Sequence, residues 1–558
     1  MLGLTYSGLL LLAAAALAAH PPAARSELSP ANCSPGTSVS LKVAATTDVH
    51  GHIRGWDYYE NRADPLRGLT RAATIVDSVR GANLGRVILL DAGDLLQGTP
   101  LAYVAARVIK TRRNPIIAAM NAMHYDAAAI GNHEFNYGVP YLNSAVAQAA
   151  FPLLAANVTR AGKAHAYAPF TIVSRAGVRV GIVGATTPGS NLWDASNLAK
   201  AKIHVGDIVP AVRAAVAQAR ANGADAIVVV LHSGLDEPSS YDTVSTAVPS
   251  ENVAARVASE VSGINVVVYG HSHRENPGQV IGHTLVIQPK NWATSVAVVT
   301  LPFACGADHR WAASAATGAL IQAAARIEQP AIVQVIEQAH QATVAYVNST
   351  VGTTPDAWRA DSSRMIPTAL TGFILDVERR ATNADLASTA AFDLRARLGP
   401  GPITVAQLAQ LYPYDNTLRA VRISGAQLKA YIEHSSRYYK TDPNGTLVPD
   451  AAVAGYNFDV VSGVNYTVDV ARPIGDRVTA LSYHGKTVAP TDSFTMALNN
   501  YRQTGGGGYA MLRGASVVYD KQQEIRQLLI DEVRRKHVMR ESDYDVKNWS
   551  FAKSGASH

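Results

Sequence analysis

Short apolar runs, each ending in a polar turn, recur between Val39 and about Thr300. The clearest are "RVILLDAGD", "AAAIGNHEF", "AIVVVLHSG" and "INVVVYGHSH". Runs this short and apolar are typical of strands that are buried on both faces. Helical stretches lie between several of them, for example Gly68 to Arg80 and Pro210 to Asn222. Alternating strands, turns and helices predict an α/β domain in which β-sheets are flanked by helices.

The rest of the chain predicts a second domain, because 558 residues are too many for one ordinary hydrophobic core. Ile321 to Asn348 is rich in Ala, Gln and Glu, a composition that favours a helix. The region from Trp358 to about Val546 has helical and strand patterns of its own. We therefore expect a first domain at 39–320, a linker helix at 321–356 and a C-terminal α/β domain at 357–548.

The N-terminus has the pattern of a signal peptide. Leu9 to Ala19 is an unbroken apolar run, and Ala16-Leu17-Ala18 is a small-x-small site for signal peptidase. The run is too short to span a bilayer comfortably, although an uncleaved anchor is the rival interpretation. We predict that residues 1–19 are removed and that the protein is exported, to the periplasm or outside the cell, with no membrane attachment afterwards.

Charge and cysteine content narrow the classes of partner and compartment. The net charge of +6 comes from scattered basic residues, so the sequence shows no stripe for a nucleic acid polymer. The only cysteines are Cys33 and Cys305, which allow one disulfide but do not require it. These features suit a soluble protein in an oxidising compartment and a small anionic substrate, and they do not indicate an oligomeric state.

Polar residues with metal-binding side chains follow five of the predicted strands. They are Asp48, His50, Asp94, Asn132, His133, His232, His271 and His273. Any one of them alone is typical of a turn or a surface residue, but ligands gather at the carboxyl ends of strands in such sheets. Imidazole, carboxylate and amide donors without thiolate suit Mn, Zn, Co, Fe or Mg. This number of donors would fill two metal sites, with Asp94 as the natural bridging carboxylate.

The motifs "TTDVHGH", "GD", "GNHEF", "LHSG" and "GHSH", in this order, resemble those of the calcineurin-like metallophosphoesterases. The resemblance implies two metal sites that share one carboxylate. One site would consist of Asp48, His50, Asp94 and His273, and the other of Asp94, Asn132, His232 and His271. His133 would stay off the metals, over the phosphate and the leaving group. Asn132 and His133 are thus the expected catalytic pair on one turn.

The second half resembles the C-terminal domain of secreted nucleotidases. The resemblance lies in "ITVAQLAQLYPYDNTLRAVRISGAQLKAYIEHSSRYY", "GYNFDVVSGVNYTVDV" and "LNNYRQTGGGGY". It implies that Tyr456 and Tyr501 sandwich a nucleobase, an interaction worth about 1–3 kcal/mol per base in other systems. From the residues alone, the favoured interpretation is that these tyrosines, with Phe458 and Tyr509, are half-buried core aromatics.

Asn136 separates two substrate classes within this resemblance. The 5'-nucleotidases carry Asp after "GNHEF", whereas the periplasmic 2',3'-cyclic-nucleotide 2'-phosphodiesterases/3'-nucleotidases carry Asn, as this chain does. His133 should then lack a charged orienting partner, and Asn136 joins Tyr456 and Tyr501 as a substrate-site residue. The Gly-rich stretch that leads to a phosphate-binding Arg in 5'-nucleotidases has no match in Ala384 to Leu398, unless Arg395 or Arg397 stands in.

The sequence therefore predicts an exported dimetal phosphohydrolase. It would hydrolyse 2',3'-cyclic nucleotides and 3'-nucleotides by means of a metal-bound hydroxide. Two alternatives stay open: a 5'-nucleotidase or UDP-sugar hydrolase of the same family, and a surface nucleotide-binding protein without catalysis.

Overall fold

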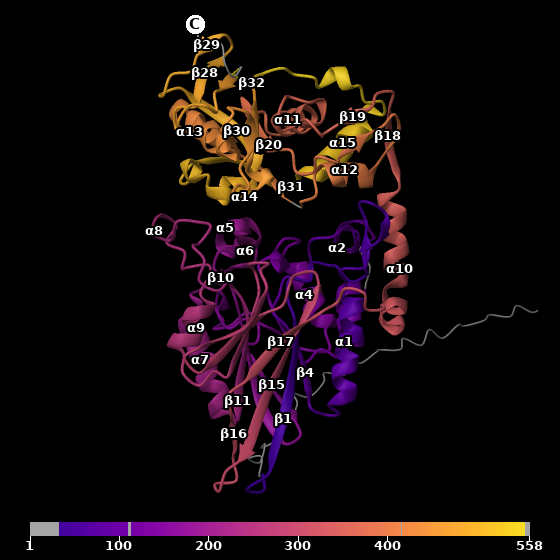
Figure 1. Cartoon of the computed structure of the whole chain (residues 1–558), viewed down its shortest axis with the longest axis vertical. Coiled ribbons are helices and arrows are strands. Elements are labelled where there is room, and N and C mark those ends of the chain that lie inside the picture. Colours follow the sequence, from indigo (N-terminus) through magenta and orange to yellow (C-terminus); the bar gives the residue numbers. More distant parts are fainter. Residues whose placement is uncertain (1–32, 110–112, 415, 553–558) are drawn as a thin grey trace, which may run out of the picture.

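The computed structural model describes residues 33–109, 113–414 and 416–552. The chain forms two domains, with the first half below and the second half above in Figure 1. Within the described ranges the structure has no helix that is both long and apolar enough to cross a membrane. The signal peptide predicted at residues 1–19 lies outside these ranges.

Two β-sheets pack face to face in the first domain. One sheet has the order β16-β15-β1-β4-β5-β6, with β17 also paired to β15, and the other has the order β13-β14-β12-β11-β9-β8. The strands of the first sheet are β1 (Ser38–Thr46), β4 (Val87–Asp91), β5 (Ala127–Ala129), β6 (Leu153–Leu154), β15 (Ser295–Cys305), β16 (Trp311–Ala313) and β17 (Thr317–Gln322). Those of the second are β8 (Phe170–Arg175), β9 (Val178–Thr186), β11 (Ala226–His232), β12 (Val266–Tyr269), β13 (Asn276–Ile281) and β14 (Thr284–Gln288).

The strand β11 shows why the apolar runs are continuous. Val228 and Val230 face the core between the two sheets, whereas Val229 and Leu231 face a helix layer on the other side. Successive side chains of a strand point to opposite faces, so a strand that is buried on both faces needs apolar residues at every position. The α/β class predicted from these runs is therefore confirmed.

Helices cover the outer face of each sheet and complete a four-layer domain. Helices α1 (Leu69–Ala82), α3 (Pro115–Ala122) and α4 (Val139–Gln148) share a core with the first sheet. Helices α7 (Ile208–Ala221) and α9 (Ala254–Glu260) share a core with the second. A disulfide joins Cys33 to Cys305 at the end of β15. It ties the first described residue of the chain to the first sheet.

The connecting helix α10 (Pro330–Val347) is shorter than the range 321–356 expected from the sequence. Residues up to Gln322 continue β17 in the first sheet, and the C-terminal domain begins with β18 (Thr350–Thr354). Pro330 sets the start, because proline fits the first turn of a helix and the Gln329 side chain accepts a hydrogen bond from Ala331 N. Ile332 and Ile336 pack into the core of the first domain, so the helix belongs to that domain (Figure 1).

A five-stranded sheet organises the second domain, with the order β26-β20-β30-β23-β31. Its strands are β20 (Leu386–Ala390), β23 (Thr417–Ser424), β26 (Asp459–Ser462), β30 (Ser493–Asn499) and β31 (Val517–Glu524). Helices α11 (Ala369–Thr382), α12 (Val405–Leu411), α13 (Gly425–Ser435) and α15 (Ile525–Lys536) contribute to the same core. A smaller sheet, in the order β29-β28-β27-β32, consists of β27 (Asn465–Val468), β28 (Val478–Tyr483), β29 (Lys486–Thr487) and β32 (Trp549–Phe551).

Candidate active site

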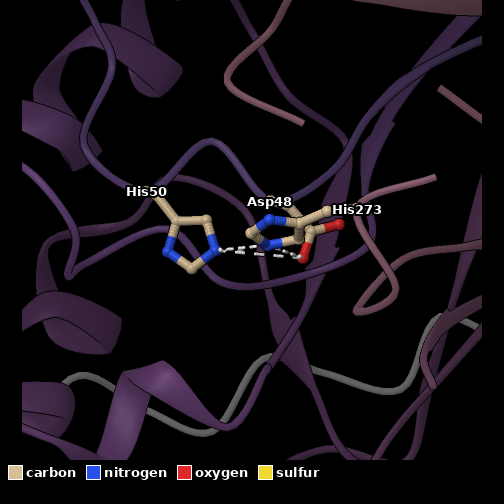
Figure 2. A group of neighbouring side chains, drawn as sticks. All are labelled: Asp48, His50 and His273. Atoms are coloured by element: carbon tan, nitrogen blue, oxygen red, sulfur yellow. Dashed lines mark hydrogen bonds and ion pairs between the residues drawn. The ribbon is translucent and has the colours of Figure 1, made fainter. Parts of the chain in front are cut away.

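The loops after four strands bring two groups of potential metal ligands together. Asp48, His50 and His273 form one group (Figure 2), and Asp94, His232 and His271 form the other. His232 is the last residue of β11 and the others follow β1, β4 and β12, so both sheets contribute at their carboxyl ends. The amide oxygen of Asn132, in the loop after β5, lies 3.1 Å from His232 Nε2. The structure thus brings together all seven residues that the sequence indicated as ligands.

Asp94 lies between the two groups. Its Oδ2 is 3.0 Å from His232 Nε2, 3.6 Å from His50 Nε2 and 4.0 Å from His133 Nε2. One carboxylate oxygen therefore faces an imidazole of each group, the position that a bridging ligand requires.

The backbone is strained at five of these side chains. Asp48, His50, Asp94, His271 and His273 have φ between 48° and 75°, the left-handed region that favours glycine. Glycine would relieve the strain but would remove the donor atom. Such conformations cost on the order of 1–3 kcal/mol each and cluster at functional sites, so the strain here fits a site selected for its side chains.

Two glycines allow the loops to approach one another. A Cβ on Gly131 would lie 2.2 Å from Asp94 Oδ1, and one on Gly270 would lie 2.0 Å from Thr47 Oγ1 and 2.7 Å from Asp48 Oδ2. All three contacts are far inside van der Waals distance. The glycines of "GNHEF" and "GHSH" are therefore required by the packing of the ligand loops against each other.

Outward hydrogen bonds orient three of the imidazoles. His50 Nδ1 donates to Gln97 O and His232 Nδ1 donates to Ala92 O, both at 2.9 Å. His271 uses the opposite nitrogen, since its Nε2 lies 2.7 Å from Glu251 Oε1. Each ring then turns its other nitrogen toward the site, which is how protein groups orient histidines that bind metals. The donor set therefore fits two divalent ions.

The charges of the site also favour cations. Burial lowers the pKa of His50 to about 3, so this imidazole is neutral. Burial acts in the same direction on His232, but the Asp94 carboxylate outweighs it and raises the pKa of His232 to about 10. Buried carboxylates that draw a proton onto a neighbouring imidazole favour any positive charge placed between them.

His133 lies beside the ligand groups and is partly exposed. Its backbone N–H donates to Asp94 Oδ1 at 2.8 Å, and its ring meets the His50 ring edge-on with 5.1 Å between centroids. Its Nδ1 is 2.6 Å from Asn136 Oδ1. Among the residues that the structure describes, no carboxylate is in direct contact with His133 Nδ1, as Asn136 predicted. However, Asn136 Nδ2 donates to Asp194 Oδ2 at 3.0 Å, so a carboxylate lies one hydrogen bond further away.

Three carboxylates of the site were missed by the sequence analysis. Glu134 is fully buried and accepts hydrogen bonds from the backbone N–H groups of Asp94, Leu95, Leu96 and Gly131. It holds the Asp94 loop against the "GNHEF" turn, and its position in that motif was the available signal. Glu251 and Asp194 lie in loops without a recognisable pattern, so nothing in the sequence linked them to His271 or His133.

The tyrosines of the second domain differ in exposure. Tyr456 and Tyr501 are 42% and 39% exposed, whereas Phe458 and Tyr509 are buried. The interpretation of Tyr456 and Tyr501 as core aromatics is therefore wrong. Tyr414, 44% exposed, is a third aromatic that the sequence analysis missed, and burial together with Tyr456 and Tyr501 raises its pKa.

Tyr501 is the exposed tyrosine that the charges of the first domain reach. Burial raises the pKa of Tyr501, and the charges acting on it include Arg502 beside it and Glu251 across the domain boundary. Glu251 is the residue that orients His271. Arg419 of the second domain donates to Trp193 O at 3.4 Å, and the Trp193 ring stacks on His271, so the two domains meet beside the ligand groups.

Arg395 and Arg397 are engaged elsewhere. Arg395 pairs with Asp393 and Glu60, and Arg397 pairs with Asp361, all at the protein surface. These partners lie outside the two ligand groups, so the structure does not support a role for Arg395 or Arg397 in binding phosphate.

Comparisons with known proteins define the class to which this architecture belongs. Residues 41–275 match the calcineurin-like phosphoesterase family, and residues 350–514 match the 5'-nucleotidase C-terminal domain. The chain belongs to the calcineurin-like phosphoesterases that carry this C-terminal domain, and it is a metal-dependent phosphoric ester hydrolase. Members of this family use two divalent metal ions, as the two ligand groups indicated.

Individual relatives are similar over most of the chain. A 2',3'-cyclic-nucleotide 2'-phosphodiesterase/3'-nucleotidase from Haemophilus influenzae is 30% identical and covers 92% of this chain and 88% of its own. The trifunctional nucleotide phosphoesterase protein YfkN from Bacillus subtilis is also 30% identical over 92% of this chain, which spans only 39% of YfkN. A Staphylococcus aureus crystal structure assigned as a 5'-nucleotidase matches with a TM-score of 0.76 and 27% identity, over 92% of this chain and 100% of its own.

Proposed function

We propose that the protein hydrolyses 2',3'-cyclic nucleotides and 3'-nucleotides. The observation that carries the proposal is the contact between the domains beside the ligand groups. The exposed Tyr501 lies two residues from Gln503, which accepts a hydrogen bond from Arg419. Arg419 also donates to Trp193 O at 3.4 Å, and the Trp193 ring stacks on His271. A nucleoside stacked in the second domain would place its phosphate at the ligand groups of the first. The second domain would then bind the nucleoside and the first domain the phosphate.

In this proposal one ion is held by Asp48, His50, Asp94 and His273, and the other by Asp94, Asn132, His232 and His271. Two divalent ions would supply Lewis acidity toward the phosphoryl oxygens and make a bound water more acidic. The residues themselves have defined tasks. The buried imidazoles and Asp94 exclude bulk water from the centre and, together with the outward contacts of the rings, fix where the phosphate is held.

His133 would act on the phosphate or its leaving group. Its Nδ1 is held by Asn136, and its Nε2 points toward Asp94 Oδ2 at 4.0 Å, at the partly exposed side of the centre. A positioned imidazole of this kind typically contributes about 10²–10⁴-fold to a rate as a general acid or base. Tyr456 and Tyr501 would bind the base and leave the chemistry to the first domain.

One observation favours cyclic substrates over 5' monoesters, and a second favours both cyclic and 3' substrates. A phosphodiester carries less negative charge than a monoester and relies less on an arginine clamp, and Arg395 and Arg397 are paired elsewhere. The relatives named for the cyclic and 3' activities are about 30% identical to this chain, against 24% for the snake venom 5'-nucleotidases.

We also propose that the protein is exported. The disulfide between Cys33 and Cys305 supports an oxidising compartment, where such bonds form and persist. The apolar run at Leu9 to Ala19 would direct this export.

A substrate panel tests the function. Purified protein supplied with Mn, Zn or Co should hydrolyse 2',3'-cyclic AMP and 3'-AMP well above 5'-AMP and a UDP-sugar. A preference for 5'-AMP would replace the proposal with the 5'-nucleotidase alternative. Two bound metals without turnover of any phosphoester would instead support the non-catalytic nucleotide-binding protein.

The tyrosines provide a second test. Tyr456→Ala and Tyr501→Ala should raise the Michaelis constant for nucleotides, because stacking binds ground and transition states alike. A small phosphodiester without a base serves as the control and should be hydrolysed at a nearly unchanged rate. Equal loss on both substrates would contradict a role in base binding.

A further inference from the structure

His133, Asn136 and the buried carboxylate Asp194 form a hydrogen-bonded chain of three side chains. His133 Nδ1 lies 2.6 Å from Asn136 Oδ1, and Asn136 Nδ2 donates to Asp194 Oδ2 at 3.0 Å. Asp194 is 3% exposed and follows α5 (Ser190–Trp193), far from the "GNHEF" turn in sequence. Two segments more than fifty residues apart therefore meet at the side chain of Asn136.

The chemistry of Asp194 dictates the orientation of Asn136. An ionised carboxylate only accepts hydrogen bonds, so Asn136 must turn its NH₂ group toward Asp194 and its oxygen toward His133. The oxygen in turn only accepts, so His133 Nδ1 must carry the proton that it donates. His133 Nε2 then faces the site, 4.0 Å from Asp94 Oδ2.

We propose that Asp194 is a positioning residue for His133 and acts through Asn136. The inference rests on the proposed function, in which His133 acts on the phosphate. Without the carboxylate, the amide of Asn136 would be free to rotate by half a turn and present its NH₂ group to Nδ1. His133 would then lose both its fixed orientation and its fixed protonation site.

Neighbouring groups hold Asp194 in place. Asn197 Nδ2 donates to Asp194 Oδ1 at 3.3 Å and to the carbonyl oxygen of Phe135 at 3.0 Å. Arg419, on β23 of the second domain, donates to Trp193 O at 3.4 Å, and its charge acts on Asp194. The carboxylate is therefore fixed by its own helix region and lies where the second domain meets the first.

Four variants test the chain. Asp194→Ala should lower kcat for 2',3'-cyclic AMP about 10–100-fold, the usual cost of removing a group that orients a site residue. Its Michaelis constant should stay close to the wild-type value, because the stacking tyrosines are unchanged. It should also bind two metals per chain, as the wild type does, because the metal ligands are unchanged. Asp194→Asn should lose less, because an amide oxygen can still accept from Asn136.

Exchanging the two side chains gives the sharpest result. Asn136→Asp alone sets two carboxylates against each other at the 3.0 Å contact and should lower kcat. Combining Asn136→Asp with Asp194→Asn restores one acceptor and one donor along the chain, with the carboxylate now next to His133. This double variant should be about 10-fold or more faster than Asn136→Asp, a rescue that a merely structural role would not produce.

Asp207→Ala is the matched control. Asp207 caps α7 by accepting a hydrogen bond from Val209 N, so its loss should cost stability without changing kcat. Two results overturn the inference: an Asp194→Ala variant with kcat within about twofold of wild type, or a double variant no faster than Asn136→Asp.

A readout without turnover separates this inference from the proposed function. In ¹⁵N-histidine NMR spectra of metal-loaded protein, the Nδ1 proton of His133, identified by its loss in His133→Ala, should shift or exchange away in Asp194→Ala. If the wild-type protein hydrolyses no nucleotide, the proposed function fails. The Nδ1 signal would still show whether Asp194 and Asn136 hold His133. An Nδ1 signal that does not change in Asp194→Ala refutes the chain whatever the substrate.

Discussion

Replacing Arg502 by Met should destabilise the second domain and weaken nucleotide binding together. Arg502, in α14 (Asn500–Gln503), is 2% exposed and pairs with both oxygens of Asp459 at 2.8 Å. It also donates to the carbonyl oxygens of Tyr456 at 2.9 Å and Gly506 at 2.6 Å. One buried guanidinium thus joins the loop that carries Tyr456 to the segment that carries Tyr501.

The magnitude follows from the charge left behind. Asp459 would keep its hydrogen bonds from the hydroxyls of Ser388 and Tyr431 but would lose its only close cation among the described residues. Breaking a buried ion pair by removing one partner typically costs about 3–5 kcal/mol, because the other charge stays buried and uncompensated. Removing both charges, with Arg502→Met and Asp459→Asn together, should recover about 2 kcal/mol or more of that loss.

Hydrogen exchange measured by mass spectrometry suits this test, because the chain has two domains and a single unfolding transition cannot be assumed. Peptides from β26 and α14 should exchange faster in Arg502→Met, while peptides from the first domain stay protected. The Michaelis constant for 2',3'-cyclic AMP should rise, and the rate on a small phosphodiester without a base should not change.

Two results would refute this reasoning. Unchanged protection of β26 in Arg502→Met would mean that Asp459 does not depend on the guanidinium. A double variant that is less stable than Arg502→Met would mean that packing, and not the unpaired charge, dominates the cost.

Three further predictions concern the metal centre and the domain boundary. Asp94→Ala should lose both metals, measured by elemental analysis, and all turnover, and two retained metals with a near-normal rate would contradict its bridging role. His133→Ala should keep both metals and lose about 10²–10⁴ in rate, whereas loss of metal would place His133 among the ligands. Burial raises the pKa of Glu524, which pairs with Arg107 of the first domain, to about 7. Because that pKa lies above the value of an unfolded glutamate, ionisation of Glu524 lowers stability as pH rises toward 7. Glu524→Gln should therefore raise the melting temperature at pH 8 but not at pH 5, and the exposed pair variant Glu260→Gln should change neither. A pH-independent difference would contradict the assignment.

The sequence by itself determined the layered domain and indicated the candidate metal donors. Strands that are buried on both faces must be apolar at every position, so β11 and β12 were recognisable as apolar runs. His232 is the last residue of β11, and His271 lies two residues after β12. Because ligands meet at the carboxyl ends of strands, the polar residues after each run could be grouped without coordinates. The glycines of the motifs carried the same information, since Gly131 and Gly270 leave room for the ligand loops.

Only the tertiary structure decided which other residues support the site. Asp194 and Glu251 follow no strand run and have no spacing relation to His133 or His271, so their hydrogen bonds depend on how distant loops fold together. The sequence also did not show which tyrosines are exposed. Tyr456 and Tyr501 are exposed and Tyr509 is buried, although all three are the same residue type, because their packing differs. The start of α10 depended on tertiary context as well, because residues up to Gln322 form the strand β17, which pairs with β15. Sequence patterns record local periodicity, whereas side-chain partners and burial are set by contacts between segments far apart in the chain.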